Sequence, residues 1–256
     1  MKQTLQAANV HVERDGHVAL VEMRRPPHNF LEAGLLADLV AAFERLDADP
    51  ECRAIVLAAE GRSFCAGGDF SGGGPSAGVT SAYAQAVRLF RTAKPIVAAV
   101  HGAAVGGGLG LALVADFRVT CPEARFSANF NRLGFHPGFG LSVTLPRLVG
   151  EQRAALLFYT GRRIDGDEAA AIGLAEESVP QPQVRARALA LAQEIAVSAP
   201  IAVQSTRRTL RARLADQVQA ATEHEAAEQQ IQFATEDVRE GVAAMAQRRT
   251  PIFKGR

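Results

Sequence analysis

Two short apolar runs constrain the fold of this chain more than any other feature of its sequence. Ala54–Ala59 (AIVLAA) and Ile96–Val100 (IVAAV) contain no polar residue, which is typical of strands buried on both faces of a parallel sheet. A glycine cluster and then a helical pattern follow each run. Because consecutive parallel strands are joined by right-handed crossovers, this order predicts an α/β fold.

The flanking segments extend the α/β prediction. Residues Val10–Met23 alternate around an Asp-Gly turn as a β-hairpin does, and the apolar positions of residues 31–46 have helical spacing. From about residue 150 the pattern is helical. We therefore predict an α/β core over residues 1–195 and a helical C-terminal region over residues 196–256.

Charge and composition exclude several classes of function. The 28 Lys and Arg residues balance 27 Asp and Glu residues, so a basic surface for nucleic acid is not expected. No apolar stretch is long enough to cross a bilayer, and the first residues lack the apolar core of a signal peptide. Cys52, Cys65 and Cys121 are scattered, which fits a reducing compartment and gives no metal-ligand spacing. These features predict a cytoplasmic enzyme without a metal, a membrane or a nucleic-acid partner.

The glycine clusters do not match the known nucleotide-binding loops. Gly106–Leu111 has Leu where the dinucleotide fingerprint requires its last glycine, and no Gly-Lys-Ser/Thr sequence is present. Gly74–Gly78 (GPSAG) matches the nucleophile elbow of serine hydrolases, but Ser-Gly-Gly precedes it where a hydrophobic strand is required. We interpret this stretch as a loop beside the site.

Spacing alone leaves two interpretations of the glycine clusters open. A helix that begins at a glycine offers unpaired N–H groups, and two such helix ends brought together would bind a developing oxyanion. Alternatively, the glycines only allow a helix and a sheet to pack closely.

The order of the motifs resembles that of one superfamily along nearly the whole chain. Ser63–Phe70 (SFCAGGDF), Lys94–Gly102 (KPIVAAVHG) and Gly106–Gly108 resemble, in this order, the crotonase (enoyl-CoA hydratase/isomerase) superfamily. The resemblance continues through Ala115–Arg118 (ADFR) to Arg248–Phe253 (RRTPIF). It implies a spiral of ββα turns with a C-terminal trimerisation region, assembly as a homotrimer or hexamer, and acyl-CoA thioesters as substrates. Coenzyme A would be part of the substrate, so no separate cofactor is expected.

The resemblance also implies which residues form the site. In this superfamily two backbone N–H groups hold the thioester oxygen, and the matching positions are Gly68 and Gly107. For Asp69 an N-terminal helix anchor is the alternative interpretation, and for Arg248 a solvated helix end. The residues that match CoA-binding or substrate-binding parts are Pro27, Phe30, Ala66, Asp69, Phe70, Phe130 and Arg248.

The acid/base positions of the superfamily hold residues that cannot transfer protons. Hydratases use a pair of glutamates to activate water, and the matching positions here are Gly110 and Phe130. The carboxylates of dienoyl isomerases and dehalogenases match Pro137-Gly138. Hydration through a carboxylate pair is therefore not expected.

His136 is the candidate base in the same segment. An imidazole is suited to removing the α-proton of a thioester, and the alternatives are a helix cap at Pro137-Gly138 or a solvent-exposed side chain. Tyr83 is a second candidate, with a place in the core as its alternative. We predict an acyl-CoA enzyme that acts through an oxyanion-stabilised thioester enolate. A CoA-thioester-binding homologue without catalysis is the alternative function.

Overall fold

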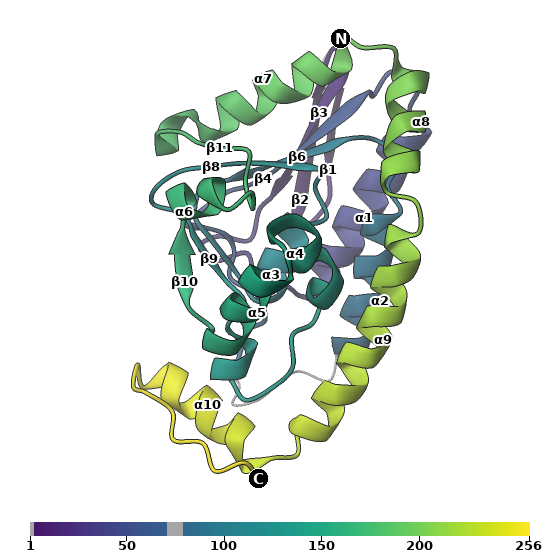
Figure 1. Ribbon diagram of the computed structural model, residues 1–256. Helices are drawn as coiled ribbons and strands as arrows, with labels where there is room; N and C mark the ends of the chain where they lie inside the picture. Colours follow the sequence, from purple (N-terminus) through teal and green to yellow (C-terminus); the bar gives the residue numbers. More distant parts are fainter. Residues whose placement is uncertain (1–2, 71–78) are drawn as a thin grey trace.

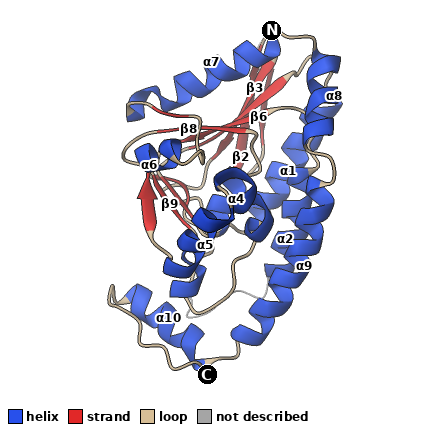
Figure 2. Cartoon of the chain, in the orientation of Figure 1, coloured by secondary structure: helices blue, strands red, loops and turns tan. Residues whose placement is uncertain are grey.

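Two β-sheets organise the described part of the chain, residues 3–70 and 79–256 of a computed structural model (Figures 1 and 2). Within these residues, the larger sheet has the strand order β1-β2-β3-β4-β6-β8-β11 and the smaller has the order β10-β9-β7-β5. The strands are β1 (Gln3–Gln6), β2 (Val10–Asp15), β3 (Val18–Met23), β4 (Ala54–Ala59), β5 (Ser63–Cys65), β6 (Ile96–Val100), β7 (Ala103–Val105), β8 (Phe117–Thr120), β9 (Arg125–Ser127), β10 (Arg163–Asp165) and β11 (Glu177–Ser178).

Helices surround the two sheets. Figure 1 shows α1, α2 and α9 running side by side along one flank, while α7 lies against strands of the larger sheet. The helices are α1 (Ala33–Ala48), α2 (Val79–Phe90), α3 (Gly107–Ala112), α4 (Leu141–Val149), α5 (Glu151–Thr160), α6 (Gly166–Ala171), α7 (Val184–Ala196), α8 (Pro200–Leu210), α9 (Leu214–Gln232) and α10 (Glu236–Ala246), with 3-10 turns at Asn129–Arg132 and Gln181–Gln183.

The larger sheet confirms the prediction of buried parallel strands. All six residues of β4 are buried, and β4 pairs in parallel with both β3 and β6. The predicted hairpin is the antiparallel pair of β2 and β3, with Asp15 opposite Val18. Apolar residues fill both faces of β4 because α1 and α7 cover strands of this sheet.

The smaller sheet brings the two glycine clusters together. Strand β5 ends just before Gly67, strand β7 ends just before Gly106, and the two strands pair in parallel. Because parallel neighbours end at the same edge of a sheet, both glycine turns emerge side by side. Sequence analysis did not place these strands residue by residue, since three residues are too few to show a period of two.

Two local predictions are wrong. The chain after residue 150 is not entirely helical, because β10 and β11 add strands to the two sheets. The helix expected at Pro137-Gly138 begins at Leu141, because residues 136–140 form an irregular turn with Phe139 and Gly140 at positive φ.

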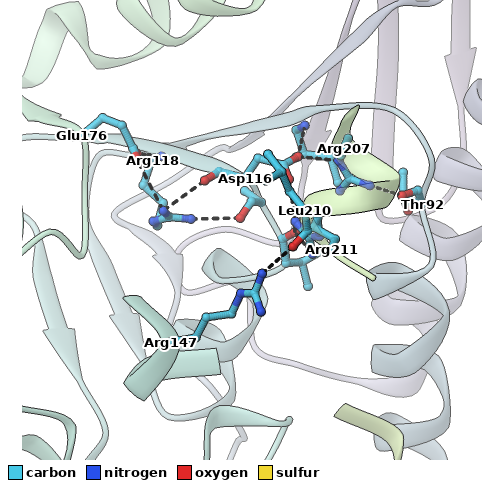
Figure 3. A network of polar contacts seen from close by, with 11 residues as sticks. Thr92, Asp116, Arg118, Arg147, Glu176, Arg207, Leu210 and Arg211 are labelled. Atoms are coloured by element: carbon cyan, nitrogen blue, oxygen red, sulfur yellow. Dashed lines mark hydrogen bonds and ion pairs between the residues drawn. The ribbon is translucent and has the colours of Figure 1, made fainter. Parts of the chain in front are cut away.

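A buried ion network attaches the C-terminal helices to the core (Figure 3). Asp116, just before β8, accepts hydrogen bonds from Arg207 Nε at 2.8 Å and from Arg211 Nη1 at 2.7 Å. Burial raises the pKa of Asp116, but the two guanidinium groups together outweigh burial and hold this pKa below its usual value. The C-terminal half of α8 and Arg211, the residue that follows it, are thereby attached to the larger sheet.

The helices of the described residues are short or polar relative to a membrane-spanning helix. In the ranges 3–70 and 79–256, no single helix is long and apolar enough to cross a membrane. One pair, residues 181–196 with 200–210, passes the test of length and composition only when taken together, and its two parts meet at a bend of 107°. The first part of this pair includes α7, which packs on the sheet.

Candidate active site

The first loop passes directly against the second glycine turn. A Cβ atom added to Gly67, whose φ is +84°, would lie 2.6 Å from the carbonyl oxygen of Val105 and 3.7 Å from the nitrogen of Gly107. A Cβ atom on Gly108 would lie 2.0 Å from the carbonyl oxygen of Cys65. Gly67 and Gly108 are therefore glycines because the backbones approach too closely for any side chain.

The two glycines next to these contacts are the ones that remain accessible. Gly68 is exposed and Gly107 is half-buried. Gly107 is the first residue of α3, so its N–H has no acceptor within the helix. The packing interpretation thus applies to Gly67 and Gly108, and the oxyanion interpretation stays a prediction for Gly68 and Gly107.

Phe139 occupies the space beside Gly110, the position that the family resemblance matches to the first glutamate of hydratases. A Cβ atom on Gly110 would lie 2.7 Å from Cδ1 and 2.8 Å from Cβ of Phe139. The Phe139 side chain is 1% exposed, and a Cβ atom on Gly107 would be 3.8 Å from its ring. An aromatic ring therefore fills the volume that a carboxylate would need.

Phe130, which the resemblance matches to the second glutamate, belongs to an aromatic cluster. Its ring meets that of Phe135 edge to face, with centroids 5.7 Å apart, and Phe135 also contacts Phe70 and Phe233 at 5.8 and 5.2 Å. Phe70 lies close to Gly68, because a Cβ atom there would be 3.3 Å from the Phe70 ring. The predicted binding residues Phe70 and Phe130 are thus brought together through Phe135.

The two segments expected to bind CoA lie side by side. The N–H of Ala66 donates to the carbonyl of His28 at 3.0 Å, and the N–H of Leu31 donates to the carbonyl of Gly67 at 2.9 Å. The Pro27 carbonyl accepts from the N–H of residue 62 at 3.0 Å. These backbone hydrogen bonds bring the segments 27–31 and 62–67 to the edge where the glycine turns emerge.

His136 points toward α9. Its ring centroid is 5.8 Å from that of His224, and its Nδ1 lies 2.8 Å from the carbonyl oxygen of Pro137. Because a carbonyl oxygen only accepts, Nδ1 carries the hydrogen and Nε2 is the basic nitrogen. The backbone of His136 is held by α9 as well, since its carbonyl accepts from Gln229 Nε2 at 2.8 Å.

The hydroxyl of Tyr83 takes the space beside Gly138. A Cβ atom on Gly138 would be 1.8 Å from this hydroxyl oxygen. The hydroxyl donates to Gln229 Oε1 at 2.8 Å and accepts the N–H of Phe139. Burial, with a smaller effect from the nearby Glu225 carboxylate, raises the pKa of Tyr83, so the phenol is neutral at physiological pH.

Three further candidates lie in different parts of the chain. Arg248 is exposed in the turn after α10, where its backbone φ is +55°. Asp69 lies in the loop 66–70, and the possible nucleophile elbow at Gly74–Gly78 falls outside the described residues. In residues 3–70 and 79–256, no group of three or more His, Cys, Asp or Glu side chains could hold a metal ion.

Comparison with known proteins identifies the family. The model of the enoyl-CoA hydratase/isomerase family matches residues 13–256. The Mycobacterium tuberculosis enoyl-CoA hydratase EchA19 is 33% identical over 263 residues, covering 96% of each chain. A crystal structure of an enoyl-CoA hydratase/isomerase from Pseudoalteromonas atlantica, 32% identical, superposes with a TM-score of 0.87 over 96% of this chain and 100% of that one. An enoyl-CoA hydratase from Mycobacterium avium subsp. paratuberculosis, 26% identical, has a TM-score of 0.85 over 97% and 100%.

These comparisons and the two-sheet α/β architecture define a crotonase-superfamily enzyme. The chain belongs to the enoyl-CoA hydratase/isomerase family, whose members process acyl-CoA thioesters. The predicted family resemblance and fold class are confirmed.

Sequence reasoning missed Phe139, Leu31 and the polar residues of α9. A Cβ atom on Gly107 would be 2.6 Å from Leu31 Cδ1, so Leu31 as well as Phe139 lies against this turn. No local pattern marks Phe139, because its place depends on a tertiary contact with Gly110. A signal did exist in α9, where Glu225, Gln229 and Gln232 fall on one helix face by their spacing.

The contact between Gly110 and Phe139 predicts a coupled effect on stability. Gly110→Ala should lower the free energy of unfolding by about 1–3 kcal/mol, because the new methyl group overpacks the core. In a Phe139→Ala background this loss should shrink, with a coupling energy of about 0.5–3 kcal/mol in a double-mutant cycle measured by urea unfolding.

Gly34→Ala in α1 is the matched control. Its Cβ atom would touch only Asn9 Nδ2, at an ordinary 3.5 Å. This substitution should leave stability unchanged or raise it by up to about 1 kcal/mol. Equal losses for Gly110→Ala with and without Phe139 would contradict the assigned contact.

Proposed function

We propose that the protein is an acyl-CoA enzyme that stabilises a thioester enolate and does not carry out ordinary hydration. The observation that carries this proposal is the contrast between Gly107, which is half-buried at the start of α3, and the buried Gly110 near it, which Phe139 covers. The donors for an oxyanion are retained, whereas the first proton-transfer position is occupied by an apolar ring.

The oxyanion would be held by the N–H groups of Gly68 and Gly107. In its support, the parallel pairing of β5 and β7 brings the two turns within contact of each other, and both glycines are open to a ligand. Backbone donors fixed in this way stabilise the negative charge on a thioester oxygen without reorganising.

His136 is the proposed base. Its Nε2 would accept the α-proton of the thioester as the enolate forms, and a solvent-derived proton would return to the same carbon. The support is the hydrogen bond from Nδ1 to the Pro137 carbonyl, which leaves Nε2 as the basic nitrogen. The aromatic residues Phe70 and Phe130 favour an apolar acyl group.

A CoA-thioester-binding protein without catalysis is the second candidate. One observation favours it: the ring of His136 lies against His224 of α9, whereas Phe139 is the side chain that contacts the second glycine turn. Tight binding of an acyl-CoA without exchange of its α-proton would establish this alternative.

We expect very slow hydration of crotonyl-CoA together with measurable α-proton exchange. Each missing proton-transfer group lowers a rate by about 10²–10⁴-fold, and the positions of both glutamates are apolar. Deuterium incorporation at the α-carbon, followed by NMR in deuterated water, should be abolished in His136→Ala and retained in His17→Ala, a hairpin control. Hydration at the rate of an enzyme with two glutamates would overturn the proposal.

The backbone donor assigned to Gly107 can be tested with two variants. One removes the N–H group, and the other keeps it and adds a side chain. Gly107→Pro removes the N–H at the first helical position, where proline is tolerated, and should lower the exchange rate about 10²–10³-fold. Gly107→Ala keeps the N–H while adding a similar contact with Leu31, so it isolates the steric effect. Equal rates in the two variants would exclude the backbone donor.

We also propose that the protein assembles as a homotrimer or a pair of trimers. The support is a set of exposed apolar side chains in and around the C-terminal helices, since exposed apolar surface is characteristic of interfaces. They are Val197, Ile201, Leu210, Ile231, Met245, Ile252 and Phe253. Sedimentation equilibrium at micromolar concentration should give at least three times the chain mass of 27.1 kDa. A species of 27.1 kDa alone would refute the assembly.

Two further proposals concern the cellular compartment of the protein and its need for a cofactor. We propose the cytoplasm, because Cys52, Cys65 and Cys121 are all buried and free, as thiols in a reducing compartment are. Coenzyme A would enter as part of the substrate, and the enolate chemistry requires no further cofactor.

A further inference from the structure

A buried carboxylate on α9 makes contacts that the proposed chemistry does not use. Glu225 is 0% exposed, and both of its oxygens accept hydrogen bonds from the turn that follows Phe139. Oε2 accepts from the N–H of Gly140 at 2.8 Å, and Oε1 accepts from the N–H and the hydroxyl of Ser142 at 3.1 and 2.6 Å. A carboxylate is costly to bury, so these three donors require an explanation.

The first explanation is that α4 cannot cap its own N-terminus. Its N-cap residue is Gly140, with φ of +72°, and a Cβ atom there would lie 2.7 Å from Val218 Cγ1 of α9. Serine, aspartate or asparagine, the usual caps, would therefore be excluded. The Glu225 carboxylate takes over this function from a neighbouring helix, at the end of α4 where the helix dipole favours a negative charge.

The second explanation is the backbone of Phe139. Its φ of +64° lies in the left-handed region, which costs a non-glycine residue free energy unless surrounding contacts hold it there. Tyr83 accepts the N–H of Phe139 on one side, and Glu225 accepts the next N–H on the other. These contacts fix the residue whose ring lies against Gly107 and Gly110.

We propose that Glu225 is a positioning residue of the active site. Its carboxylate holds the segment 139–142 and thereby places Phe139 against the second glycine turn, Gly106–Gly108. Its effect on chemistry rests on the proposed function, whereas its effect on the turn does not. The C-terminal helical region thereby completes the site of its own chain, in addition to any part in assembly.

Two neighbouring side chains of α9 support this assignment. Gln229 donates to the carbonyl of His136, and the side-chain oxygen of Gln232 accepts the N–H of His136 at 2.5 Å. With Glu225 they form one face of α9 that binds the backbone of residues 136–142 at both ends. Burial also raises the pKa of Glu225, and its three hydrogen bonds and the nearby His136 oppose this effect.

The test compares Glu225→Ala and Glu225→Gln with Glu223→Gln, an exposed glutamate on the same helix. Hydrogen exchange of the Gly140 and Ser142 amides, followed by NMR, should accelerate about tenfold or more in Glu225→Ala and stay unchanged in Glu223→Gln. Glutamine has one acceptor oxygen where the carboxylate has two, so Glu225→Gln should leave one of the two amides protected and expose the other.

Catalysis gives a second readout. In Glu225→Ala, kcat for α-proton exchange should fall about tenfold to a hundredfold while KM for the acyl-CoA changes less than about threefold. A rise in KM with unchanged kcat would overturn the proposal. Full protection of both amides in Glu225→Ala or in Glu225→Gln would do so as well.

The two proposals fail in distinguishable ways. If the wild-type protein exchanges no α-proton, the proposed function fails, and amide exchange still decides whether Glu225 holds the turn. If Glu225→Ala does not fold, Ser142→Ala removes one of the three donors and should expose the turn to a smaller extent. No change in amide exchange in Ser142→Ala and Glu225→Gln would then overturn the positioning role.

Discussion

The parallel pairing of β5 and β7 is the contact on which the site depends. These three-residue strands end at the same edge of the smaller sheet, so the loops that follow them meet. The backbones approach so closely that a Cβ atom added to Gly67 would collide with the Val105 carbonyl, and one added to Gly108 with the Cys65 carbonyl. Steric exclusion of side chains at these two positions allows the turns that carry Gly68 and Gly107, the proposed oxyanion donors, to lie against each other.

Aromatic side chains occupy the space beside two glycines near this edge of the smaller sheet. Gly110 provides a void rather than a carboxylate, and Phe139 fills it with an apolar ring held in a left-handed backbone conformation. Tyr83 fills the corresponding space beside Gly138 with a neutral hydroxyl. The apolar ring of Phe139 would strengthen hydrogen bonds to the proposed oxyanion, because such bonds weaken in a water-filled site.

Sequence patterns predicted those parts of the molecule that depend on local periodicity or on ordered motifs. The buried strands β4 and β6, helix α1 and the hairpin followed from periodicity, and the family followed from motifs in sequence order. The placement of Phe139 could not be predicted, because it depends on a contact between residues that are far apart in the chain. The spacing of Glu225 on α9 marks a polar helix face, but it does not show which residues that face meets, because the partners of Glu225 at Gly140 and Ser142 are far away in the chain.

The central claim is that the oxyanion donors are retained while the glutamate space is closed by Phe139. A crystal structure of the protein with a non-reactive acyl-CoA analogue that keeps the thioester carbonyl oxygen tests this most directly. The account predicts a thioester oxygen within hydrogen-bond distance of the nitrogens of Gly68 and Gly107, with the Phe139 ring still against Gly110. An analogue whose thioester oxygen meets neither nitrogen, or a Phe139 ring displaced by an ordered water beside a carboxylate, would contradict it.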